Sequence, residues 1–75
     1  MELIGLTKKK ILLEIAKRPS HGYQLAISLT LPLSTIYGHL KDLEELGLIG
    51  KKICDRQIVY NLTDKGKTFI KVINP

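Results

Sequence analysis

The chain has 75 residues, of which 44% are hydrophobic, and its formal net charge at pH 7 is +5. This length suits one domain, and the apolar content is too high for a disordered chain. No apolar run reaches the roughly 20 residues that cross a bilayer. The first residues also lack the order of a signal peptide, so we expect a soluble, cytoplasmic protein.

The chain contains one cysteine, Cys54, and two histidines eighteen residues apart. A single cysteine excludes an internal disulfide, and the histidines do not have the spacing of metal ligands. We therefore expect no metal and no cofactor. A disulfide that joins two subunits through Cys54 stays an alternative.

Charge is distributed unevenly along the sequence. Residues 1–40 carry a net charge of +3, residues 41–50 carry −2, and residues 51–75 carry +4. Positive charge on both sides of a negative segment is typical of an oriented surface that binds a polyanion. The alternative is a solvated lysine-rich surface without a ligand.

The first half of the chain predicts two helices. Thr7 is the expected N-cap of a helix over residues 8–18, which Pro19 ends. Ser20 is the expected N-cap of a second, short helix over residues 21–29. The residues expected to face inward are Ile11, Leu12, Ile15 and Ala16 in the first helix, and Leu25, Ala26 and Leu29 in the second.

A third helix is predicted over about residues 32–46, with Pro32 in its first turn and Gly47 at its end. Ile36, Leu40 and Leu43 recur at helical spacing and form one apolar stripe. The opposite face carries small, hydroxyl-bearing or cationic residues, namely Ser34, Thr35, Tyr37, Gly38 and Lys41. Such a face suits the groove of a DNA duplex, while Asp42, Glu44 and Glu45 fall in the last turns, away from phosphates.

From Leu48 onward the apolar period changes to two, which predicts a β-hairpin over about residues 49–62. Asp55 and Arg56 lie at its expected tip, but neither is typical of a tight two-residue turn, so a longer or distorted loop is an alternative. Thr63 is the expected N-cap of a last helix over residues 64–73. The order predicts an α+β fold with one domain over residues 1–75: a winged helix-turn-helix with a three-helix core, a two-stranded hairpin wing and a C-terminal helix.

Four segments resemble the PadR group of winged-helix transcriptional regulators: HGYQLA at 21–26, STIYGHL at 34–40, LEELGLI at 43–49 and YNLTDKG at 60–66. The chain departs from that group at Gly38, where PadR proteins usually carry proline. It also ends at Pro75, before the helical region with which PadR proteins dimerise and enclose effectors. The resemblance implies a small DNA-binding regulator, of a kind found in archaea and viruses, without a small-molecule effector. The Ile- and Lys-rich composition is compatible with a thermophilic source.

These patterns predict a regulator that binds double-stranded DNA. The predicted recognition helix lies in the major groove, with Ser34, Thr35, Tyr37, Gly38 and Lys41 as contacts. The predicted wing lies on the flanking groove or backbone, with Lys51, Lys52, Arg56 and Gln57 as contacts. The predicted phosphate contacts at the start of the second helix are Ser20, His21 and Gln24.

Two copies on a pseudo-palindrome would give a small domain enough affinity, so we expect a homodimer. Its predicted interface consists of Leu3, Ile4, Leu6, Phe69, Ile70 and Ile73. The alternative function is a winged-helix module for protein–protein interaction, because one fold serves many functions. No nucleophile–base–acid set or phosphate-binding loop is visible, so we do not expect an enzyme.

Overall fold

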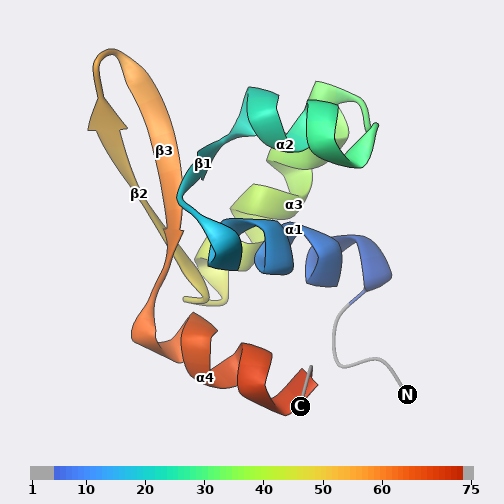
Figure 1. Cartoon of the computed structure of the whole chain (residues 1–75), viewed down its shortest axis with the longest axis vertical. Coiled ribbons are helices and arrows are strands. Elements are labelled where there is room, and N and C mark those ends of the chain that lie inside the picture. The colour runs from blue at the N-terminus through green and yellow to red at the C-terminus, as the bar shows by residue number, and fades with distance from the viewer. Residues whose placement is uncertain (1–4, 74–75) are drawn as a thin grey trace.

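The computed structural model describes residues 5–73, which form four helices and a three-stranded antiparallel sheet (Figure 1). The elements follow in the order α1 (Leu6–Lys17), β1 (Ser20–His21), α2 (Gly22–Leu29), α3 (Leu33–Glu45), β2 (Ile49–Cys54), β3 (Gln57–Leu62) and α4 (Asp64–Ile73). This order confirms the predicted α+β winged helix-turn-helix. Within the described range, no helix has the length and apolarity needed to cross a membrane.

The core lies where α1, α2 and α3 pack together against the sheet. Its fully buried side chains are Ile11, Leu12, Leu25, Ile36, Leu40 and Leu43. Leu48, Ile49 and Tyr60 extend this core to the sheet. Burying each large aliphatic side chain contributes about 2 kcal/mol, so these residues supply most of the driving force for folding. The apolar stripe predicted on α3 is therefore confirmed as its core face.

Helix α1 differs in two details from its prediction. It begins at Leu6 after the N-cap Gly5, and no side chain caps it, so Thr7 lies inside the helix. Ala16, expected to face inward, is exposed. It lies beside a groove between α1 and α4, because α4 approaches α1 without closing over this position.

The sheet contains a strand that the sequence did not predict. Strand β1 pairs with β3, placing Ser20 opposite Tyr60 and His21 opposite Val59, and the strand order is β1-β3-β2. The predicted two-stranded hairpin is present as β2 and β3, and β1 adds a third strand to it. A strand of two residues is too short to give an alternating pattern, so periodicity could not reveal it.

Strands β2 and β3 form the wing, which projects from the helices at the opposite end of the longest axis from α4 (Figure 1). Their pairing runs from Ile49 opposite Leu62 to Cys54 opposite Gln57. Only Asp55 and Arg56 lie between the strands, with φ angles of 49° and 68°. The turn is therefore a tight two-residue one, and both of its residues adopt the left-handed conformation.

The junction between α3 and α4 is tied by the Thr63 side chain. Its Oγ1 accepts a hydrogen bond from Gly66 N at 3.0 Å, which confirms Thr63 as the N-cap of α4. The same hydroxyl donates to Gly47 O at 2.6 Å, and Gly47 has a φ of 77°, as its predicted place after α3 requires. These contacts hold α4 against the turn that leads from α3 into the wing.

Candidate nucleic-acid interface

The outward face of α3 includes the five residues predicted for it. Ser34, Thr35, Tyr37, Gly38 and Lys41 are all exposed. Beyond its chain neighbours and the backbone of its own helix, a Cβ added at Gly38 would meet no atom within 4 Å, so this position is open to close approach. This face therefore offers hydroxyl and ammonium groups together with accessible backbone.

Tyr37 differs from the other four because its ring also has a structural contact. A Cβ placed on Gly22 would lie 2.7 Å from Tyr37 Cε1, so the ring rests against the first residue of α2. The side chain still remains 44% exposed. Tyr37 thus joins α2 to α3 and leaves part of its ring on the surface.

The predicted contact residues of the wing are all exposed, but they differ in whether they form an ion pair within the molecule. Lys52, Arg56 and Gln57 are exposed near or at the tip. Lys51 is also exposed, but its Nζ lies 3.5 Å from Glu44 Oε1 on α3. Its charge is therefore partly neutralised within the molecule, and it holds the base of the wing near α3.

The start of α2 requires a correction. Ser20 is only 5% exposed and its hydroxyl donates to Arg18 O, so it is not the N-cap and does not present its side chain to a ligand. The N-cap is His21: its Nδ1 accepts from Gln24 N, and Gln24 Oε1 accepts from His21 N, both at 3.2 Å. Pairing with β3 holds Ser20 in strand β1 and moves the cap one residue onward.

A hollow of about 390 Å³ lies between the start of α2, the outer face of α3 and the wing tip. Its lining residues are His21, Tyr23, Tyr37, Arg56, Gln57 and Ile58. Tyr23 and Ile58 were not predicted to take part in binding. Tyr23 is 62% exposed and its ring stacks on His21, with 6.5 Å between the centroids. No local signal in the sequence indicates this hollow, because three separate elements form it.

Intramolecular contacts neutralise much of the acidic end of α3. Lys8 on α1 lies 3.4 Å from Asp42, and Lys51 pairs with Glu44 as described. Lys65 on α4 donates to Leu46 O at 2.8 Å, which places a cation at the C-terminal end of α3, where the helix dipole favours positive charge. The negative segment predicted from the sequence is therefore largely paired with lysines of neighbouring elements.

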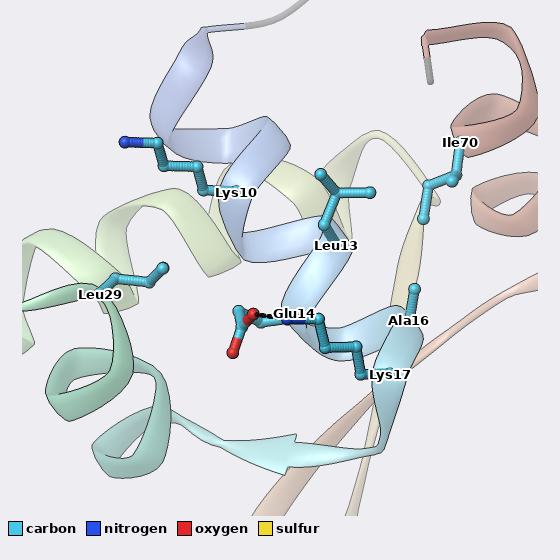
Figure 2. Close-up of a pocket in the computed structure, with 7 residues that line it drawn as sticks. All are labelled: Lys10, Leu13, Glu14, Ala16, Lys17, Leu29 and Ile70. Carbon is cyan, nitrogen blue, oxygen red and sulfur yellow. Dashed lines mark hydrogen bonds and ion pairs between the residues drawn. The ribbon is translucent and has the colours of Figure 1, made fainter. Parts of the chain in front are cut away.

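A second surface lies between α1 and α4, remote from the wing tip. Figure 2 shows Leu13 and Ala16 of α1 between Leu29 of α2 and Ile70 of α4, with the Glu14–Lys17 ion pair at the edge of the groove. The residues predicted for a dimer interface lie partly here. Phe69, Ile70 and Ile73 pack against the protein's own core and are half-buried, whereas Leu6 is exposed. Leu3 and Ile4 lie outside the described residues.

Across residues 5–73, histidine, cysteine and carboxylate side chains form no group of three that could hold a metal ion. Cys54 is a free, exposed thiol in the wing. The polar groups that the interface offers are therefore hydroxyls, amides, cations and the imidazole of His21.

A sequence profile described as "Bacterial regulatory protein, arsR family" matches residues 6–51, which is more than half of the chain. The chain belongs to the arsR family. The matched region of this ArsR-family chain runs from α1 to the start of β2 and contains both helices of the helix-turn-helix. No curated protein is significantly similar to the sequence.

Several solved structures share the fold of this ArsR-family chain. A variant of Lactococcus lactis ZitR in complex with DNA is 25% identical, with a TM-score of 0.84 over 91% of this chain and 49% of that one. The transcriptional regulator Tm0710 from Thermotoga maritima is 29% identical, with a TM-score of 0.83 over 91% of this chain and 50% of that one. The transcriptional regulator BldR from Sulfolobus solfataricus is 22% identical, with a TM-score of 0.90 over 95% and 53%. The chain spans about half the length of each.

Proposed function

We propose that this ArsR-family chain is a transcriptional regulator that binds double-stranded DNA. Helix α3 enters the major groove with Ser34, Thr35, Tyr37, Gly38 and Lys41, and the wing lies on the flanking groove or backbone. The observation that carries this proposal is the placement of the outer face of α3 and the wing tip around one hollow, with both exposed. The ZitR variant solved with DNA, whose fold is similar, supports it.

Electrostatics gives the proposal a direct test. Fluorescence anisotropy of a 25-base-pair duplex across a salt series measures the affinity and its dependence on ionic strength. Wild type should bind, and log K should fall against log[salt] with a slope of about −0.9 for each phosphate neutralised. Replacing Lys52 and Arg56 together with glutamine should weaken binding and make the slope shallower.

A matched control comes from α4, at the far end of the molecule from the wing tip (Figure 1). The double variant Lys67→Gln/Lys71→Gln makes the same change in net charge on exposed positions. It should retain the wild-type slope. Equal losses of affinity in the two double variants would show that affinity depends only on net charge. The absence of wild-type binding at low salt would contradict the DNA-binding function.

We also propose that the chain acts as a homodimer through the surface formed by α1 and α4. Leu6 and Val72 are 56% and 62% exposed on these helices. Leu13 and Ala16 of α1 and Ile70 of α4 line a groove on the same two helices, and exposed apolar surface of this kind is typical of interaction sites. Sedimentation velocity should show a species of twice 8.4 kDa. A dilute sample that sediments only as the monomer would contradict the dimer.

The narrower resemblance to PadR proteins stays a prediction. It depends on the HGY sequence at residues 21–23. The structure gives these residues specific local roles: His21 caps α2, Gly22 accommodates Tyr37, and Tyr23 stacks on His21.

A further inference from the structure

Among the side chains that line the hollow beside the wing tip, those of His21 and Arg56 can donate to an anion from two different elements. His21 belongs to the start of α2 and Arg56 to the tip of the wing, and both line the same space. The backbone amides at the start of α2 are partly used, since His21 N and Gln24 N already donate within the capping box.

The hydrogen bonds of His21 determine which ring nitrogen carries the proton. Its Nδ1 accepts from Gln24 N, so in the neutral ring the proton resides on Nε2. The ring of Tyr23 stacks on the imidazole with an interplanar angle of 23°. The imidazole is thus held by two neighbours, and its remaining polar atom is a donor.

Arg56 occupies a backbone position that is unfavourable for its residue type. Its φ of 68° follows that of Asp55 at 49°, and the second residue of such a turn is usually glycine. A residue with a Cβ in this conformation costs roughly 1 kcal/mol. Among residues 5–73, no carboxylate forms a salt bridge with Arg56 to offset that cost. A cation kept at a strained turn is an observation from which a binding role can be inferred.

We propose that the hollow binds one backbone phosphate of the DNA, between the Nε2–H of His21 and the guanidinium of Arg56. This inference rests on the proposed DNA-binding function. The phosphate accepts two hydrogen bonds, one from His21 at the start of α2 and one from Arg56 of the wing. The bond from the Arg56 guanidinium is charge-assisted. The phosphate therefore links the wing tip to the helix-turn-helix, beside Tyr37 of the recognition helix.

The strained backbone at Arg56 separates stability from affinity, because replacing Arg56 should change the two in opposite directions. Arg56→Gly relieves the left-handed backbone and removes the cation. Its melting temperature should equal or exceed that of wild type, while its affinity for a 25-base-pair duplex falls about tenfold. The salt slope should become shallower by about 0.9. A lower melting temperature with unchanged affinity would overturn the proposal.

His21→Asn is the second variant, because asparagine retains an N-cap while removing the imidazole Nε2–H. It should weaken binding with little change in melting temperature. The double variant should lose less affinity than the two single losses combined, since both groups contact one phosphate. Strictly additive losses would overturn the shared site. His39→Asn, on α3 outside this hollow, is the control for loss of an imidazole.

Duplexes with single methylphosphonates identify the contact directly, because each lacks the charge of one phosphate. One position should weaken binding by wild type, weaken binding by Arg56→Gly and His21→Asn less, and leave the affinity of the double variant unchanged. An alternative outcome is that Arg56→Gly loses preference for A·T-rich flanks while His21→Asn binds normally. That result would place Arg56 in the minor groove and overturn the proposal. Absence of wild-type binding to any duplex would contradict the DNA-binding function itself.

Discussion

The ring of Tyr37 lies so close to Gly22 that a Cβ at position 22 would be 2.7 Å from its Cε1 and 2.9 Å from its hydroxyl oxygen. The two residues belong to the facing helices of the helix-turn-helix. Only glycine allows the ring to lie across the start of α2. This contact therefore sets how the recognition helix presents Tyr37 to the hollow.

Gly22→Ala should force the Tyr37 ring out of its place. We expect a loss of about 1–2 kcal/mol in the free energy of unfolding, because the ring must leave a packed position or strain it. Urea denaturation measures this loss. DNA affinity should fall as well, since the displaced ring enters the hollow or the face of α3.

A double-mutant cycle separates this contact from other effects at position 22. In a Tyr37→Ala background, Gly22→Ala should cost much less, because no ring remains to be displaced. If alanine at position 22 costs the same in both backgrounds, the contact with Tyr37 is not the reason for glycine there.

The docking of α4 depends on a second glycine. A Cβ at Gly66 would collide with Leu48 O, a backbone atom that cannot move aside as a side chain can. Gly66→Ala should therefore destabilise the domain by about 3 kcal/mol, as overpacking against a rigid neighbour does. Thermal unfolding checks this prediction.

Gly38→Ala is the matched control, since Gly38 also lies inside a helix but an added Cβ there would meet no atom within 4 Å outside its own stretch of helix. Alanine favours the helix, so this variant should be more stable by about 1 kcal/mol. Similar losses of stability in both variants would show that the contact with Leu48 does not explain the need for glycine at position 66.

The sequence predicted those features of the fold that depend on local patterns. The stripe of Ile36, Leu40 and Leu43 indicated α3, and the cap residues Gly47 and Thr63 marked two boundaries that the structure confirms. Each signal lies within a few residues of the element it describes. The exposed face of α3 followed from the same helical period.

Prediction from the sequence was wrong where contacts with distant segments determine the local structure. Serine is a common N-cap, so Ser20 was the natural choice, but its pairing with Tyr60 forty residues later holds it in a strand. The hollow was missed for the same reason. His21, Tyr37 and Arg56 come together only once α2, α3 and the wing are packed.

Tyr60 makes the stability of the domain decrease at alkaline pH. Burial, followed by the proximity of Tyr37 and of the Glu44 carboxylate, raises the pKa of Tyr60 above its ordinary 10.0. The folded protein therefore keeps the phenol proton at pH values where the unfolded chain has lost it. Its contribution to stability is complete below pH 10 and is lost as the pH rises through the folded-state pKa.

Tyr60→Phe should remove this dependence. The difference in free energy of unfolding between wild type and Tyr60→Phe should be constant below pH 10 and should shift in favour of the variant above it. Comparing the two proteins cancels the titration of the lysines, which is common to both. A difference that stays constant up to pH 11 would contradict the role of Tyr60.

The ion pair between Glu44 and Lys51 competes with the proposed DNA contact. Glu44 Oε1 lies 3.5 Å from Lys51 Nζ, and both side chains are partly exposed. Glu44→Gln should change stability by less than about 0.5 kcal/mol, because exposed pairs contribute little. It frees Lys51 to neutralise a phosphate, so DNA affinity should rise and the salt slope should steepen by up to about 0.9.

Glu14→Gln provides a control with the same change in net charge. Glu14 pairs with Lys17 at 2.8 Å beside the groove between α1 and α4, on a surface that the proposed complex leaves free of DNA (Figure 2). Releasing Lys17 there should leave the slope unchanged, although the added positive charge raises affinity slightly at low salt. If the two variants steepen the slope equally, Lys51 makes no particular contact with DNA, and the base of the wing serves only to join β2 to α3.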